Sequence, residues 1–195
     1  MHAGILTFTN VDDIDGAVRF LSDKALPILR AQRGYRGVTA SADRSSGLFA
    51  NLSLWDTEAD RDASETALAP TREEARHLVS PHLILENYEV TTEELVTAPA
   101  VGLALMVTPI SIDPAAVDDE IAFFQSQVVP GTRQADGFCG LRQCINRRTG
   151  NGLVGSAWRD EHAMHTYWAN CHRAEGRPVT LGEPSFRELV FVDIN

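Results

Sequence analysis

The sequence predicts an α+β fold built from two copies of one β-α-β-β-α-β unit. The main observation is an internal repeat: the Gly-Tyr-Arg-Gly of residues 34–37 returns 103 positions later as the Gly-Phe-Cys-Gly of residues 137–140, and Trp55 returns as Trp158. The positions that agree are mainly Gly, Pro and Trp, which determine turns and packing. Apolar runs of strand length also alternate with segments of helical periodicity. We therefore expect two similar folding units of about 90 residues each.

The first copy shows each element in turn. Residues 5–9 form an apolar run of strand length, and apolar residues then recur at helical spacing over 14–26, after Asn10 or Asp12 as an N-cap. Residues 38–43 and 48–55 are strand candidates on either side of an Arg-Ser-Ser-Gly turn. A second helix begins near Thr57, and the last strand covers 83–90. This is the element order of a ferredoxin-like unit.

The second copy repeats the order. We expect strands at 103–109, 141–146, 153–158 and 186–193, with helices at 114–129 and from Asp160. The first unit is assigned to residues 1–92 and the second to 101–195, with a linker at about 93–100 that contains Pro99. A four-stranded sheet covered by helices on one face leaves its other face bare, so we expect the two sheets to pack against each other as an internal pseudo-dimer. Whether two chains then form a further homodimer stays open.

The composition is that of an acidic globular protein. The formal net charge is −10 and the hydrophobic content is 44%. Phosphate binding needs clustered Lys and Arg, so the charge argues against a nucleic-acid or anionic-membrane surface. No apolar run approaches the ~20 residues of a membrane helix, and the N-terminal segment lacks the basic region and cleavage site of a signal peptide. The 3 cysteines lack a framework spacing, so we expect reduced thiols and a cytoplasmic protein.

The two sides of the strand at 48–55 differ in character. One side is apolar and suited to packing against the helices: Leu48, Ala50, Leu52 and Leu54. The other side is aromatic and polar: Phe49, Asn51, Ser53 and Trp55. We expect this second side to line a cavity on the face of the sheet away from the helices. The alternative is a second face that is simply solvated.

Together these elements resemble the antibiotic-biosynthesis-monooxygenase domain of the dimeric α/β-barrel superfamily. The resemblance rests on residues 34–37, the hairpin strands and the Leu-Trp-Asp-Thr-Glu-Ala of residues 54–59, matched in the second copy by residues 157–163. It implies an intramolecular dimeric α/β barrel, since most members are single domains that dimerise sheet to sheet. The superfamily includes oxygenases, haem enzymes and isomerases, so the fold does not determine the chemistry.

The resemblance also implies a site in the first copy. The family's cofactor-free anthrone oxygenases have an Asn and a Trp at the spacing of Asn51 and Trp55, with a Tyr and an Arg nearby. Arg76 is the candidate for the Arg, whereas the start of the second helix has no Tyr. Apart from the resemblance, His77 or His82, on either side of the entry to the last strand, could act as a base; the alternative is a solvated loop residue. Asn51 would bind a phenolate or carbonyl oxygen, with Phe49, Ser53 and Trp55 around the ligand. The alternatives are a packing role for Trp55 and Trp158 and a hydrogen-bonding role in the cavity for Asn51.

The second copy's helix is the other segment that could carry chemistry. His162, His165 and His172 share a helical face, beside Trp168, and could ligate haem iron. The alternative is an exposed polar helix face, and no His-Glu-x-x-His motif is present. We predict no metal. The haem residues of the family are divided between the copies, and Val154 replaces Asn51 in the second copy.

These observations favour a monooxygenase-like protein that needs no cofactor and oxidises or binds an aromatic, polyketide-type small molecule in the first copy. The first alternative is a haem- or small-ligand-binding protein without turnover, using Trp158, His165, Trp168 and His172. The second is an inactive structural half that supports one active half. The sequence leaves open whether the protein is an enzyme.

Overall fold

The structure is a computed structural model of the 195-residue chain, and it describes residues 1–170 and 179–194. The predicted fold class is confirmed: the chain is α+β, with antiparallel strands and helices in ferredoxin-like order. Its contacts divide it into unit 1 (Met1–Asn87 with Leu189–Asn195) and unit 2 (Tyr88–Glu188). Among the described residues, no helix is long and apolar enough to span a lipid bilayer.

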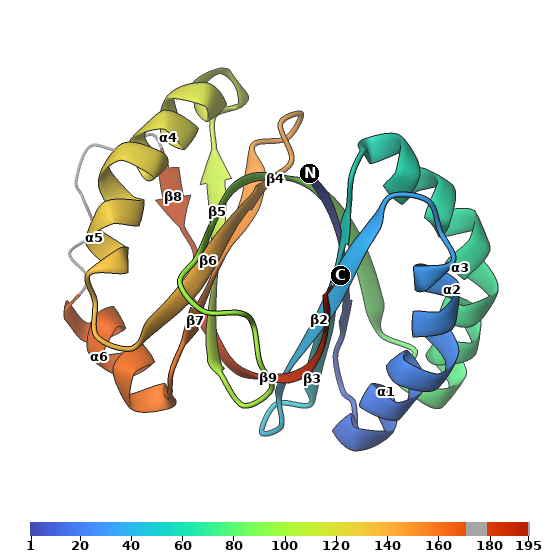
Figure 1. The fold of residues 1–195 in the computed structure, drawn as a ribbon. Helices are drawn as coiled ribbons and strands as arrows, with labels where there is room; N and C mark the ends of the chain where they lie inside the picture. The colour runs from blue at the N-terminus through green and yellow to red at the C-terminus, as the bar shows by residue number, and fades with distance from the viewer. Residues whose placement is uncertain (171–178, 195) are drawn as a thin grey trace. The chain divides into compact units, whose positions relative to one another are not determined.

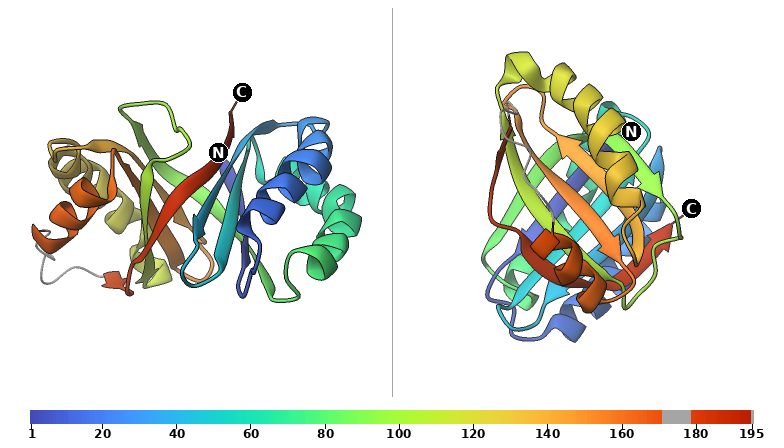
Figure 2. Two further views of the ribbon diagram at one scale, coloured as in Figure 1. Left: turned by 90° about the horizontal axis from the view of Figure 1, so that it is seen from below. Right: turned by 90° about the vertical axis from the view of Figure 1, so that its left-hand side faces the viewer.

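Unit 1 has its helices on one face of its sheet (Figure 1; Figure 2, left). Its elements, in chain order, are β1 (His2–Phe8), α1 (Ile14–Phe20), the π-helical η1 (Leu21–Ala25), α2 (Leu26–Arg30), β2 (Tyr35–Asp43), β3 (Leu48–Trp55), α3 (Glu58–Leu78) and the first part of β4 (Leu83–Leu95). The start of α3 is capped by Thr57, whose side chain accepts a hydrogen bond from the backbone N–H of Asp60. Pro27 is the second residue of α2, which follows directly after the π-helical η1.

Unit 2 repeats this arrangement. Its elements are β5 (Ala104–Ile112), the short η2 (Pro114–Ala116), α4 (Val117–Phe123), the π-helical η3 (Phe124–Val128), α5 (Val129–Arg133), β6 (Phe138–Ile145), β7 (Asn151–Trp158), α6 (Glu161–Asn170), β8 (Val179–Leu181) and β9 (Ser185–Ile194). The π-helical segments begin 103 residues apart, at Leu21 and Phe124. Gly34 and Gly137 have φ angles of 72° and 75°, so each takes the left-handed conformation that glycine tolerates best. The sequence repeat therefore has a matching repeat of local structure.

Two strands belong to both units. In unit 1 the strand order is β4-β1-β3-β2-β9, and in unit 2 it is β9-β5-β7-β6-β4, with the short β8 paired to the end of β5. Apart from β8, each sheet thus has the four strands of a ferredoxin-like unit and a fifth strand that continues from the other copy. The predicted linker at 93–100 begins inside β4, because β4 continues to Leu95 by pairing with β6, where Leu95 lies opposite Gly140.

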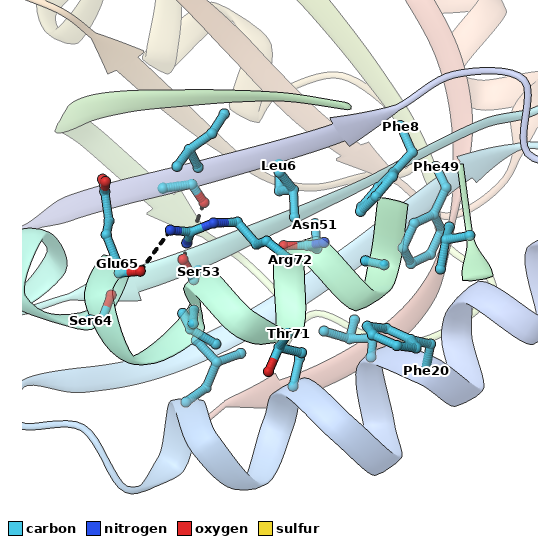
Figure 3. Close-up of a pocket in the computed structure, with 18 of the residues that line it drawn as sticks. Leu6, Phe8, Phe20, Phe49, Asn51, Ser53, Ser64, Glu65, Thr71 and Arg72 are labelled. Atoms are coloured by element: carbon cyan, nitrogen blue, oxygen red, sulfur yellow. Dashed lines mark hydrogen bonds between the residues drawn. The ribbon is translucent and has the colours of Figure 1, made fainter. Parts of the chain in front are cut away.

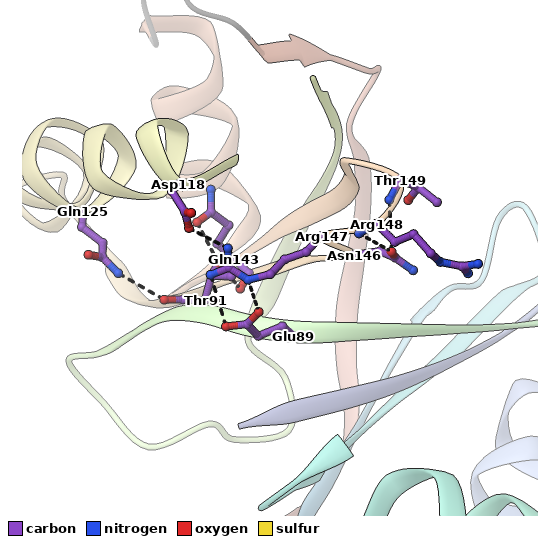
Figure 4. Close-up of polar contacts among 9 residues, drawn as sticks. All are labelled: Glu89, Thr91, Asp118, Gln125, Gln143, Asn146, Arg147, Arg148 and Thr149. Carbon is purple, nitrogen blue, oxygen red and sulfur yellow. Dashed lines mark hydrogen bonds and ion pairs between the residues drawn. The ribbon is translucent and has the colours of Figure 1, made fainter. Parts of the chain in front are cut away.

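Polar side chains hold the end of β4 in unit 2 (Figure 4). Arg147, in the turn after β6, bonds to Glu89 of β4 and lies 2.6 Å from Asp118 of α4. The buried Gln143 side chain accepts a hydrogen bond from the Thr91 hydroxyl at 2.9 Å. These contacts anchor β4 where its pairing with β6 shifts register, between Val90 and Thr92.

One expectation about β3 is wrong. The side with Phe49, Asn51, Ser53 and Trp55 faces the helices of unit 1, because Phe49 and Trp55 pack in one core cluster with α1 and α2 residues such as Ala17 and Leu29. Alternate side chains point to opposite faces, so Leu48, Ala50, Leu52 and Leu54 occupy the other face. Ala50 and Leu54 are buried as well, so hydrophobicity along the strand did not distinguish the two faces.

Candidate functional site

The candidate site is a pocket inside unit 1, between the helix layer and the sheet (Figure 3). Its walls are mostly apolar, formed from β1, β3 and the helical segments by side chains that include Leu6, Phe8, Phe20 and Phe49. The π-helical η1 contributes Leu21 and Ala25 to the lining. The cavity volume is about 70 Å³. The unit therefore encloses an apolar space directly against the aromatic and polar side of β3.

Asn51 and Arg72 are two polar residues of the pocket lining that make few contacts with other polar groups. The structure shows no side-chain hydrogen bond from Asn51 to another described residue, although Asn51 lines the pocket. Arg72 extends from α3 toward Ser53 and the Glu65 backbone, and its Nη2 donates to the Glu65 carbonyl oxygen at 2.7 Å (Figure 3). None of the described carboxylates lies within ion-pairing distance of Arg72. Burial lowers the pKa of this guanidinium, and the nearby Glu65 carboxylate opposes the effect.

Trp55 combines packing with a place in the pocket lining. Its side chain is fully buried, and its ring makes an edge-on contact with Tyr35, with centroids 5.6 Å apart. Its indole Nε1 donates to the Ser53 hydroxyl at 3.0 Å, and this hydroxyl donates to the Gly4 carbonyl oxygen at 3.2 Å. Trp158 makes the same contact with Ser156, at 2.9 Å. Since both copies satisfy the indole internally, the N–H of Trp55 is not available to a ligand, and its ring serves as a wall.

Glu65 and Asn87 form a second polar group in the pocket lining. The Asn87 side-chain amide donates to Glu65 Oε1 at 2.7 Å. Arg61 also lines the pocket, but its guanidinium is paired with Asp62 at 2.6 Å and with Glu58 at 3.2 Å. Glu65 is therefore a carboxylate that faces the pocket and is held by an amide rather than by a cation.

Arg76, predicted from the resemblance, and His77, predicted as a base, are not among the pocket-lining residues. Arg76 lies one helical turn beyond Arg72 and contacts Glu73 at 3.5 Å and the Pro81 carbonyl oxygen at 3.3 Å. The His77 side chain is 76% exposed and also lies 3.5 Å from Glu73.

Arg72 was missed by sequence reasoning, although a signal for it exists. The pocket-lining residues of α3 recur at helical spacing, as Arg61, Ser64, Glu65, Leu68, Thr71, Arg72 and Ala75. This spacing marks Arg72 as inward-facing, whereas Arg76, four residues later, is excluded by its absence from the pocket lining and not by the spacing.

Bulkier side chains stand at two of the equivalent positions in unit 2. The residues 103 positions after Asn51, Arg61, Ser64 and Glu65 are Val154, Met164, Tyr167 and Trp168. Met164 is fully buried. The Tyr167 ring lies 4.5 Å from the Trp158 ring, and its hydroxyl lies 2.9 Å from the Thr132 hydroxyl. Aromatic side chains of the unit 2 core thus stand where unit 1 has Ser64 and Glu65.

The remaining predicted residues of the second copy are not gathered around one cavity. His165 is exposed and its ring contacts Phe186, with centroids 4.6 Å apart, whereas Trp168 packs partly buried on the unit 2 core. His172 lies outside the described residues. A separate groove beside α6 is lined by residues that include Asp136, His162 and Tyr167.

Haem does not fit the donor set of the unit 1 pocket. The described residues that line it include no His, Cys, Met or Tyr, so none offers an axial ligand for haem iron. Nor do the described residues contain a group of three or more His, Cys, Asp or Glu side chains arranged to hold a metal ion.

Comparisons with known proteins show the fold but no family by sequence. No family model matches the chain. An uncharacterized Mycobacterium tuberculosis protein, Rv2557, is 25% identical over 151 residues, which cover 77% of this chain and 67% of the relative. A second protein of the same strain, Rv2558, is also 25% identical, over 65% of this chain and 53% of its own length.

Solved structures resemble nearly the whole chain. An anthrone oxidase-like protein gives a TM-score of 0.69 at 13% identity, covering 99% of this chain and 93% of its own. A monooxygenase-like protein from Listeria innocua gives 0.55 at 10% identity, covering 96% and 93%. A haem-degrading enzyme from Listeria monocytogenes gives 0.53 at 10% identity, covering 96% and 99%. At these identities the likeness shows the shared fold, which is the fold of monooxygenase-like and haem-degrading proteins.

Proposed function

We propose that unit 1 binds an aromatic small molecule that carries an ionisable phenol or enol oxygen, and promotes its oxidation by dioxygen without a cofactor. The observation that supports this most is the Arg72 guanidinium, which lines an apolar pocket with no carboxylate partner among the described residues. The guanidinium is partly buried, and this burial lowers its pKa, so the charged form is disfavoured there. An anionic ligand would supply a counter-ion for it.

Asn51 completes the binding geometry in this proposal. It projects from β3, whereas Arg72 projects from α3, so the two reach the pocket from opposite walls. Two donors at one ligand oxygen stabilise the phenolate or enolate form over the neutral form, and a charge-assisted hydrogen bond contributes roughly 1.5–3 kcal/mol. The anion is the electron-rich form that reacts with oxygen, while the apolar wall excludes water from it.

The size of the cavity sets a condition on the ligand. An apolar cavity of about 150 Å³ holds benzene, whereas this cavity has a volume of about 70 Å³. A ligand ring therefore enters only when lining side chains move aside. Phe20 and Leu68, which are partly buried and come from two different helices, are the side chains we propose to move.

The comparisons support a monooxygenase-like function at the level of fold, since an anthrone oxidase-like protein and a monooxygenase-like protein have the same fold. We therefore propose anthrone as the test ligand. Oxygen consumption with anthrone is expected for the wild-type protein and is expected to fall about 10-fold or more in Asn51→Ala, because one donor to the developing oxyanion is lost. Asn151→Ala, an exposed residue of the second copy, serves as the matched control.

Two results would contradict the proposal. One is oxygen consumption at the wild-type rate in Asn51→Ala. The other is a purified protein with a haem Soret band that is lost in His165→Ala, which would favour the haem-binding alternative in unit 2.

A further inference from the structure

We propose that Glu65 accepts the proton that leaves the ligand, and that Asn87 positions its carboxylate for this step. The inference rests on the proposed function, because it assigns the base of the same pocket. Arg61, Glu65 and Arg72 are the charged residues among the described residues that line the pocket. Arginine stays protonated in proteins and cannot act as a base at neutral pH, and Ser, Thr, Asn and Trp side chains are not bases there. Glu65 is the remaining candidate.

The contacts of Glu65 suit this role. Its Oε1 is held by the Asn87 amide at 2.7 Å, while the structure shows no hydrogen bond or ion pair to Oε2 from another described residue. An amide donor orients the carboxylate without supplying the full counter-charge of an arginine. Arg72 lies close enough to interact electrostatically, but it bonds to the Glu65 backbone carbonyl rather than to the carboxylate. One carboxylate oxygen is thus oriented, and the other remains available to a ligand.

An enolisable ketone needs two different groups of the pocket wall, one at its oxygen and one at its acidic C–H. Glu65 and Arg72 lie on α3, and Asn51 lies on the facing strand. In anthrone the carbonyl oxygen and the acidic methylene lie on opposite sides of the central ring. With the oxygen at Asn51 and Arg72, the methylene C–H is directed toward another part of the wall, where we place Glu65.

The step balances without any further reagent. The methylene C–H bond breaks, its electron pair moves into the ring system to form the enolate, and the proton goes to Glu65 Oε2. The negative charge passes from the carboxylate to the ligand oxygen, where Arg72 and Asn51 stabilise it. In D₂O the deuterated carboxyl group returns a deuteron, so the protein catalyses hydrogen–deuterium exchange even when oxygen is absent.

Anaerobic exchange at the anthrone methylene, followed by NMR or mass spectrometry, therefore tests the base separately from oxidation. Glu65→Gln is expected to slow the protein-catalysed exchange by about 10²–10⁴-fold. Glu73→Gln, an exposed carboxylate on the same helix, is the matched control and should exchange at the wild-type rate. Because a variant can fail by unfolding, Glu65→Ala is also measured with added formate, and recovery of the exchange is expected as formate takes the place of the carboxylate.

Asn87 has its own readout. Asn87→Leu removes the donor that orients Glu65 Oε1. The maximal rate of exchange is therefore expected to fall, while the anthrone concentration at half-saturation stays unchanged, because Asn87 acts on the base and not on the ligand oxygen. Asn87→Gln keeps an amide donor and is expected to recover part of the lost rate. A change confined to half-saturation would contradict the positioning role.

The outcomes separate the two proposals. Exchange at the wild-type rate in folded Glu65→Gln overturns the assignment of Glu65, even if oxygen consumption still depends on Asn51. Exchange that depends on Glu65 in a protein that consumes no oxygen supports the base and overturns the oxidation. A wild-type protein that neither exchanges nor oxidises anthrone overturns both.

Discussion

Replacing Arg72 by methionine should weaken ligand binding while leaving stability nearly unchanged. Arg72→Met keeps most of the aliphatic stem but removes a cation that has one hydrogen bond, to the Glu65 carbonyl oxygen, and no carboxylate partner among the described residues. Losing that bond costs about 1 kcal/mol. The guanidinium is only partly buried, so its removal relieves a desolvation cost of similar size at most. The free energy of unfolding is therefore expected to stay within about 1 kcal/mol of the wild-type value.

Binding of an anionic ligand should weaken in the same variant. A lost charge-assisted hydrogen bond of roughly 1.5–3 kcal/mol corresponds to about 10- to 150-fold in Kd. Titration with an aromatic phenolate, followed by quenching of tryptophan fluorescence, measures this change, since Trp55 lines the pocket. Thermal melting of the same samples measures stability, where 1 kcal/mol corresponds to about 2–4 °C in a chain of this size.

Arg76→Met is the control, because Arg76 is exposed on the same helix and lies outside the pocket lining. It should leave Kd unchanged. If Arg72→Met instead lowers the melting temperature by several degrees and binds the ligand like the wild type, then Arg72 is a structural residue and the reasoning is refuted.

Two further predictions concern the unit 1 pocket and the contacts of β9. Ser64→Tyr introduces the side chain that stands at the equivalent position of unit 2, Tyr167. Ligand binding should be abolished, and overpacking should cost about 1–3 kcal/mol of stability. Unchanged binding by titration would contradict the comparison between the two units. The hydrogen bonds from Arg30 and then Tyr35, opposed by partial burial, hold the pKa of Asp193 below its usual value. Asp193 therefore stabilises the fold above about pH 4 and loses this contribution as the pH falls through its folded pKa. In urea titrations near neutral pH, Asp193→Asn should lower the free energy of unfolding by roughly 1 kcal/mol. At about pH 2 the variant and the wild type should be equally stable. If the difference in free energy stays the same at all pH values, the charge of Asp193 is not its cause.

The polar face of one strand was not enough to identify the whole site. Asn51 and Trp55 both line the pocket, because their spacing places both on one face of β3. The partner residues come from α3 and β4, and their side chains meet in space rather than in sequence: Arg72, Glu65 and Asn87. A helix stripe marks Arg72 and Glu65 as inward, but only packing shows that no carboxylate reaches Arg72.

The sequence also could not show which face of the sheet carries the pocket. Both sides of β3 carry residues that become buried, Ala50 and Leu54 on one side and Phe49 and Trp55 on the other. An alternating pattern gives the period of a strand but not the direction in which each face points, because that direction is decided by where the helices pack. The prediction placed the polar side away from the helices, and the structure places it under them.

The sequence by itself determined the two copies, their element order and the turns that recur 103 residues apart, since Gly, Pro and local periodicity act over a few residues. Tertiary structure decided which copy keeps an open pocket, because that depends on how side chain volumes from separate elements add up. It also decided that Asp193, 158 residues after Tyr35, completes unit 1 by bonding to the Tyr35 hydroxyl. Strand pairing between distant segments is set by the packing of whole sheets, and no local pattern along the chain encodes it.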